Sequence, residues 1–117
     1  MLAKSARLTE SADFARATKS GLRFSTQNFV GYLYPTDLDQ PAHAGLIISK
    51  NVGGSVARHR IARKIRHTFR DLYPQLPTGS LLVIRALNSA HEADTAQEVT
   101  KIVGQLLKKL SEKANQK

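Results

Sequence analysis

One stretch of this chain, residues 58–70, restricts the possible folds more than any other. It reads Arg-His-Arg-Ile-Ala-Arg-Lys-Ile-Arg-His-Thr-Phe-Arg, with six of the chain's eighteen Lys and Arg residues and no acid. Large apolar residues nevertheless recur every three or four positions, at Ile61, Ile65, Phe69 and Leu72. This spacing is typical of one face of an amphipathic helix. The sequence therefore predicts a helix with one side against a protein core and a cationic side that faces a polyanion.

The composition of the whole chain also indicates a nucleic-acid partner. The 117 residues carry a formal net charge of +9, and the pI of about 10.3 is in the range of nucleic-acid-binding domains. Helices that bind an anionic membrane surface usually present Trp or Phe, and this chain has no Trp and four Phe. We therefore expect no membrane partner. The length predicts one domain, residues 1–117, with a core of about residues 7–112.

Local signals predict the other elements. Ser11 is a candidate N-cap of a helix that ends near Gly21, and Ser55 is a candidate N-cap of the basic helix, which should end near Leu72. Thr95-Ala96-Gln97-Glu98 is a capping box that opens a final helix. Strands are predicted at residues 29–34, 45–49 and 80–86, with a possible further strand within 22–28. The order predicts an α+β or α/β fold with a small sheet, and a right-handed crossover is the general expectation for residues 45–86.

The residues do not include a catalytic set. There is no Cys, the four His do not cluster, and the nine acids are scattered. His59 and His67 are two helical turns apart, roughly 12 Å, which is too far to act on one phosphate. We predict no catalytic residue and no metal site in the protein. Residues 1–20 lack the apolar core of a signal peptide, so we expect a cytoplasmic location.

The predicted helix separates into two sides when residues are placed at about 100° steps. The apolar side holds Ala57, Ile61, Ile65, Phe69 and Leu72. The other side holds Arg60, Arg63, Lys64, Arg66, His67 and Arg70, with His59 among them and Arg58 near the boundary. A charged face that only aids solubility usually mixes both signs. Nucleic acid is therefore the preferred partner, and Arg suits it because a guanidinium group forks onto phosphate and stacks on bases.

These residues resemble a known family. Ser49-Lys50-Asn51-Val52-Gly53, followed by Val56-Ala57-Arg58-His59-Arg60-Ile61-Ala62-Arg63-Lys64-Ile65-Arg66, resembles the signature of the bacterial ribonuclease P protein subunit. Arg7-Leu8, Asp13-Phe14, Gly21 and residues 29–32 match its N-terminal pattern. The resemblance covers roughly residues 7–110. His59 replaces the usual Asn of the family's Arg-Asn-Arg motif, and Ala62 replaces a usual basic residue, which predicts one charge fewer on the RNA-facing helix.

The resemblance implies a fold, a function and a set of site residues. The fold is a small α+β sandwich, similar to a ribosomal-protein S5 domain, with a left-handed βαβ crossover. The protein does not cut RNA. A catalytic RNA with bound Mg²⁺ removes the 5′ leader of precursor tRNA, and no organic cofactor or obligate protein partner is expected. The residues expected to bind the catalytic RNA are Arg58, His59, Arg60, Arg63, Lys64, Arg66 and Arg70.

The leader is expected to lie in a cleft lined by Phe14, Arg16, Tyr32 and Lys50. An aromatic residue on a helix and another on a sheet face can stack unpaired bases of any sequence. Phe14 could instead be a core residue, whereas Tyr32 is expected to be exposed. Two other function classes share the basic helix: a general RNA chaperone or ribosome-associated structural protein, and a DNA-binding regulator. The chain lacks the helix spacing of a helix-turn-helix protein.

Overall fold

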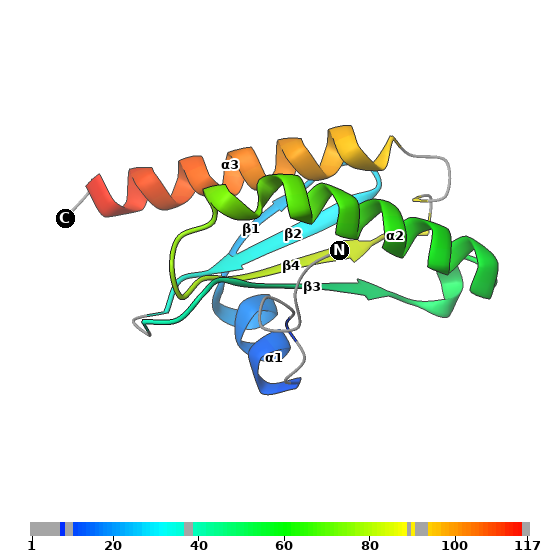
Figure 1. Cartoon of the computed structure of the whole chain (residues 1–117), viewed down its shortest axis with the longest axis horizontal. Helices are drawn as coiled ribbons and strands as arrows, with labels where there is room; N and C mark the ends of the chain where they lie inside the picture. The colour runs from blue at the N-terminus through cyan, green and yellow to red at the C-terminus, as the bar shows by residue number, and fades with distance from the viewer. Residues whose placement is uncertain (1–7, 9–10, 37–38, 89, 91–93, 116–117) are drawn as a thin grey trace.

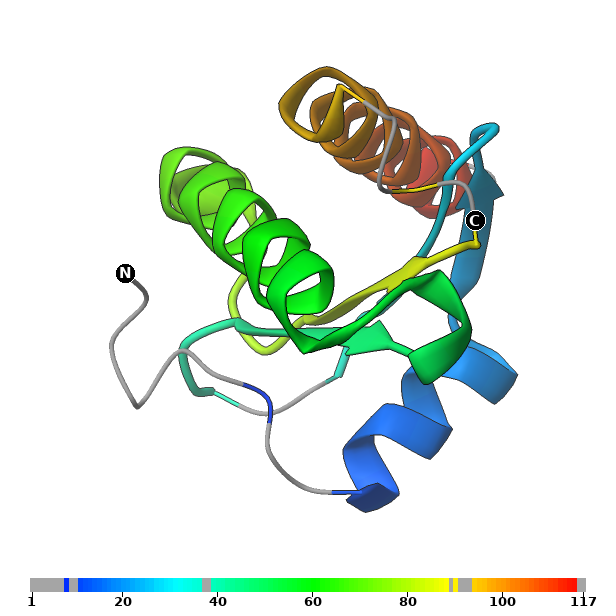
Figure 2. The same cartoon turned by 90° about the vertical axis from the view of Figure 1, so that its right-hand side faces the viewer.

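The computed structural model describes residues 8, 11–36, 39–88, 90 and 94–115, with side chains of the last helix described up to Glu112. Arg7, part of the matched N-terminal pattern, lies outside these residues. Within them, the helices α1 (Ser11–Ser20), α2 (Ser55–Leu72) and α3 (Thr95–Asn115) pack on one sheet. Its strands are β1 (Leu22–Ser25), β2 (Phe29–Tyr34), β3 (His43–Ile48) and β4 (Leu81–Ala86). Helices α2 and α3 cover one face, and α1 covers the other (Figures 1 and 2).

The sheet has the strand order β1-β2-β4-β3. Strand β2 is antiparallel to β1 and β4, whereas β3 and β4 are parallel and are joined through α2. Seen from the α2 side with these strands pointing up, β4 lies to the left of β3, so the crossover is left-handed (Figures 1 and 2). The right-handed expectation was wrong, and the hand implied by the resemblance is correct. With this strand order, a right-handed crossover would place α2 on the α1 side, away from α3.

The main core lies between the sheet and the helices α2 and α3. Ile61, Ile65 and Phe69 of α2 are at most 3% exposed, which confirms the predicted apolar face. They belong to one cluster with Phe29, Leu33, Leu82 and Ile84 of the sheet and with Val99, Ile102, Val103 and Leu106 of α3. Ala96, in the first turn of α3, is exposed, whereas Ile102 is fully buried.

Helix α2 ends where predicted, at Leu72, but begins one residue earlier than a Ser55 N-cap would place it. Gly54 is the N-cap and provides no side-chain hydrogen bond, while Ser55 is the first helical residue. The short 3-10 helix η2 (Lys50–Val52) leads into it from β3 and buries Val52. At the other end, Pro74 lies in a second 3-10 helix, η3 (Tyr73–Gln75). Pro cannot continue an α-helix beyond its first turn, which explains why α2 ends at Leu72.

The start of α3 also differs from the expected capping box. The Asp94 carboxylate, and not Thr95, accepts a hydrogen bond from the Gln97 backbone N–H, at 3.2 Å. Glu98 does not reach back to the helix start. Its carboxylate accepts hydrogen bonds from the Thr26 hydroxyl (2.7 Å), the Asn28 side-chain amide (2.7 Å) and the Asn28 backbone N–H (3.1 Å). Glu98 therefore ties the first turn of α3 to the β1–β2 turn.

Candidate nucleic-acid interface

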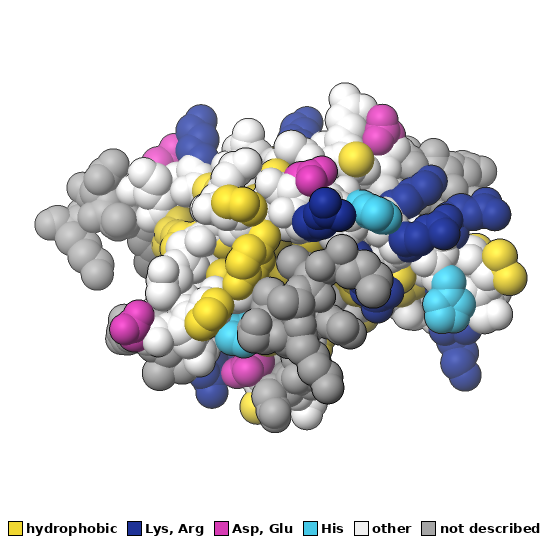
Figure 3. Space-filling model, in the orientation of Figure 1, with side chains coloured by type: hydrophobic (Ala, Val, Ile, Leu, Met, Phe, Trp, Pro, Cys, Tyr) yellow, Lys and Arg dark blue, Asp and Glu magenta, His cyan; other side chains and the backbone are white. Residues whose placement is uncertain are grey.

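The exposed side of α2 carries the predicted cationic residues. His59, Arg60, Arg63, Lys64, Arg66, His67 and Arg70 are all exposed, because the buried positions Ile61, Ile65 and Phe69 fix the rotation of the helix against the sheet. Figure 3 shows the dark blue side chains gathered over the first part of α2, with histidine beside them. The structure therefore brings seven of the eight basic and imidazole residues predicted for this helix onto one surface, which we call the α2 basic face.

Arg58 and Ala62 lie apart from this face. Arg58 is half-buried in the first turn of α2. Its Nε is one of two buried side-chain atoms without a hydrogen-bond partner among the described residues. Ala62 is 7% exposed. The predicted loss of one charge relative to the family stays a prediction, and in this chain the Ala62 side chain is nearly buried.

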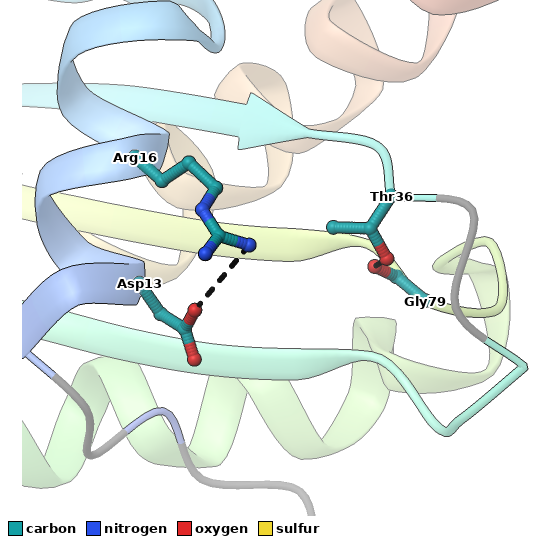
Figure 4. Close-up of polar contacts among 4 residues, drawn as sticks. All are labelled: Asp13, Arg16, Thr36 and Gly79. Carbon is teal, nitrogen blue, oxygen red and sulfur yellow. Dashed lines mark hydrogen bonds and ion pairs between the residues drawn. The ribbon is translucent and has the colours of Figure 1, made fainter.

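The charges of the α2 basic face are not neutralised within the described part of the chain. The ion pair seen among the described residues is on a different helix, α1. It joins Arg16 and Asp13, with 3.9 Å between Nη1 and Oδ1 (Figure 4). The acid on α2 itself is Asp71, in the last turn. Like charges three and four residues apart, such as Arg60, Arg63 and Lys64, weaken a helix by a few tenths of a kcal/mol per pair. Burial of the apolar side must offset this repulsion.

The opposite face of the sheet holds the aromatic residues expected in the leader cleft. The Phe14 ring lies against β3, since a Cβ placed on Gly45 would be 2.7 Å from Phe14 Cζ. Phe14 is half-buried. Tyr32 is 9% exposed and belongs to the cluster beneath α1 with Val30, Leu81 and Val83. The expectation that Tyr32 is exposed was wrong. Alternation along the strand predicts on which face of the sheet Tyr32 lies, but it does not predict that a helix covers that face.

Basic side chains accompany this aromatic cluster. Arg16 on α1 is exposed, as is Arg23 on β1, the strand partner of Tyr32. Lys50, also predicted for the cleft, is exposed in η2, beyond the end of β3. The Thr36 hydroxyl, just after β2, donates a hydrogen bond to the Gly79 carbonyl, just before β4, at 2.6 Å (Figure 4). We call this side of the molecule the α1 sheet face.

Arg85 is a candidate site residue that the sequence analysis missed. It is exposed, although β4 is an interior strand and its other residues are buried. It alternates with Leu81 and Val83 and therefore lies on the α1 sheet face, beside its strand partners Val30 and Ile47. The signal was present in the sequence, since an Arg within an otherwise apolar strand needs contact with water or with a charged partner.

Two further searches of the described residues bear on the site. None of the His, Asp and Glu side chains form a group of three or more that could hold a metal ion. No helix in this part of the chain has the length and apolar character that crossing a bilayer requires.

Comparison with known proteins decides the family. The sequence profile of the Ribonuclease P family matches residues 2–111. The chain belongs to the ribonuclease P protein family. As a family member, it is part of an endoribonuclease ribonucleoprotein that acts in tRNA processing, and its partner is the ribonuclease P RNA.

Relatives and solved structures agree with this assignment. The ribonuclease P protein component of Streptomyces griseus subsp. griseus is 42% identical over 105 residues, covering 83% of this chain and 85% of that protein. That of Acidothermus cellulolyticus is 36% identical over 110 residues, covering 91% and 92%. The RNase P protein of Staphylococcus aureus superimposes with a TM-score of 0.75 at 25% identity, covering 86% of this chain and 94% of that one. The α+β fold implied by the resemblance is therefore confirmed.

Proposed function

We propose that the α2 basic face binds the ribonuclease P RNA. The single observation that carries this proposal is the row of exposed Arg and Lys side chains along α2, none of them in an ion pair among the described residues. Phosphate groups relieve the repulsion between such side chains and release condensed counterions when they bind. The residues assigned to this contact are His59, Arg60, Arg63, Lys64, Arg66 and Arg70. Arg58, which was predicted together with them, is half-buried beside this face and is a secondary candidate.

The 5′ leader of precursor tRNA is assigned to the α1 sheet face. Arg16 and Arg85 are exposed there, and Lys50 is exposed in η2, so that the three can contact leader phosphates. Phe14 is half-buried, and an unpaired base can pack against the accessible part of its ring. Tyr32 supports this surface from below, since it lies beneath α1. Contacts of this kind hold a single strand with little dependence on its sequence.

In this proposal the RNA subunit carries out the chemistry. It binds the Mg²⁺ and hydrolyses the phosphodiester that joins the leader to the mature tRNA, while the protein alone is inactive. The protein lowers the electrostatic repulsion between the two RNAs and so raises the affinity for the leader. Its effect should be largest at low Mg²⁺, where the RNAs are least screened by cations.

Reconstitution tests this function directly. The full chain, the ribonuclease P RNA and a precursor tRNA are combined at low Mg²⁺, and release of the leader is followed on a gel. We expect cleavage only when both the chain and the RNA subunit are present. Cleavage by the chain alone would contradict the division of labour. Cleavage by the RNA that the chain does not stimulate would favour a general RNA chaperone.

The leader assignment predicts a selective effect of Arg85. We expect Arg85→Ala to weaken binding of precursor tRNA to the reconstituted complex by about tenfold, the loss of one or two phosphate contacts. Mature tRNA, which lacks the leader, should bind within about twofold of wild type. Arg85 is a cleaner probe than Tyr32, because truncation of a buried tyrosine also loosens the core. Equal losses for both tRNAs would refute the assignment, and Lys101→Ala on α3 is the control.

A further inference from the structure

The α2 basic face begins with an exposed apolar side chain. Val56 is 73% exposed, and no other large hydrophobic side chain among the described residues is exposed. It lies in the first turn of α2, three residues before His59, four before Arg60 and seven before Arg63. These spacings put all four side chains on one stripe of the helix. A phosphate group has no apolar surface that could cover Val56.

The surface beside Val56 is hollowed. An open hollow of about 570 Å³ is lined, among the described residues, by Val56, His59, Arg60, Arg63, Arg66 and His67. The stripe from Val56 to His67 is about 16 Å long at the α-helical rise. It therefore joins one apolar side chain, two imidazoles and three guanidinium groups. Imidazole and guanidinium planes are among the groups on which nucleobases stack in single-stranded RNA complexes.

We propose that this stripe binds an unpaired nucleotide of RNA, with its base against Val56 and His59 and its phosphates on Arg60 and Arg63. This inference rests on the proposed role of the α2 basic face and names the form of RNA that the face recognises. The positive charges of Arg60 and Arg63 favour a polyanion as the partner. The exposed Val56 favours a polyanion that also has an apolar surface. A base that leaves its stack has such a face on both sides.

A continuous RNA duplex fits this stripe less well. The bases of an A-form helix are stacked on one another, and its narrow major groove excludes side chains. A duplex can therefore give phosphates to Arg60 and Arg63 but no base to Val56. His59 supports the inference, because its ring adds a stacking plane next to Val56. The side-chain amide of the Asn that is usual at this position is a smaller plane.

Two matched RNA hairpins test the inference with the full chain. One contains a single bulged 2-aminopurine, and the other has the same stem fully paired. We expect the bulged hairpin to bind about tenfold tighter, the effect of one stacked base, with quenching of the 2-aminopurine fluorescence. Val56→Ser should bring the two affinities within about twofold while the affinity for the paired hairpin is unchanged. His59→Ala should likewise bring the two affinities within about twofold. Both sites are exposed, so these variants should keep the fold, which a thermal melt checks.

Lys101→Ala, which removes an exposed charge from α3, is the matched control and should keep the preference. Equal binding of both hairpins by wild type would overturn the inference, as would a preference that Val56→Ser and His59→Ala both retain. Neither result bears on the reconstituted cleavage. If the chain still stimulates cleavage, the proposed function stands while this inference fails. If the chain does not stimulate cleavage, the proposed function fails. The nucleotide site is still supported in that case if wild type prefers the bulged hairpin and the two variants lose this preference.

Discussion

Arg60→Ala/Arg63→Ala should lower the affinity of the chain for the ribonuclease P RNA by on the order of a hundredfold at physiological salt. Both residues are exposed in the middle of the α2 basic face, and neither has an ion-pair partner among the described residues. Each guanidinium group that contacts a phosphate releases about one counterion. The slope of log affinity against log salt should therefore become shallower by about two. Fluorescence anisotropy at several salt concentrations between 50 and 200 mM measures both quantities.

Lys101→Ala/Lys108→Ala is the control for this variant. It removes the same charge from α3, again from exposed positions, and so keeps the net charge of the two variants equal. If the effect came from net charge alone, both double variants would lose the same affinity. The proposal requires the α3 variant to remain within a few-fold of wild type and to keep the full salt slope.

The same α2 variant should not lose stability. Arg60 and Arg63 are three residues apart, and Arg60 and Lys64 are four apart, so their removal relieves repulsion worth a few tenths of a kcal/mol per pair. The helix is held by Ile61, Ile65 and Phe69 on its other side. Affinity and stability are therefore expected to move in opposite directions, which distinguishes a binding surface from a structural one.

Local sequence signals were sufficient for α2. Its end at Leu72 follows from the apolar period and from Pro74, and its start was predicted to within one residue, although Gly54 and not Ser55 is the N-cap. The same period also separates the buried from the exposed positions. Because the α2 basic face depends only on that separation, it could be predicted before the fold was known. The signature residues 49–66 then gave the family.

The features that depend on distant parts of the chain could not be derived in this way. The periodicity of residues 45–86 is the same for either hand of the crossover, and the hand came only from the family resemblance. Tyr32 has the alternation of an exposed residue, but α1 packs over it. Glu98 matches a capping box, but its hydrogen-bond partners lie 70 and 72 residues earlier. In each case a tertiary contact overrides the local preference.

Gly31→Ala should be strongly destabilising, because β2 and α3 are in close contact at this glycine. A Cβ on Gly31 would overlap Ile102 Cγ2 and would lie 3.1 Å from Leu106 Cδ1 and 3.2 Å from Ile84 Cδ1. Ile102 Cγ2 is attached directly to its own Cβ and cannot move aside without a change of rotamer or a shift of α3. Overpacking of this kind costs roughly 1–3 kcal/mol of the free energy of unfolding. Urea denaturation of the purified chain measures it.

Gly104→Ala supplies the matched control, since it makes the same change on the exposed side of α3. No atom lies within 4 Å of a Cβ at this position. Alanine there should raise the free energy of unfolding by about 0.5–1 kcal/mol, through its higher helix propensity. The two Gly→Ala variants are thus expected to have opposite signs. In an Ile102→Ala background, which removes Cγ2, Gly31→Ala should cost much less. An unchanged cost in that background would show that Ile102 is not the residue that requires glycine at position 31.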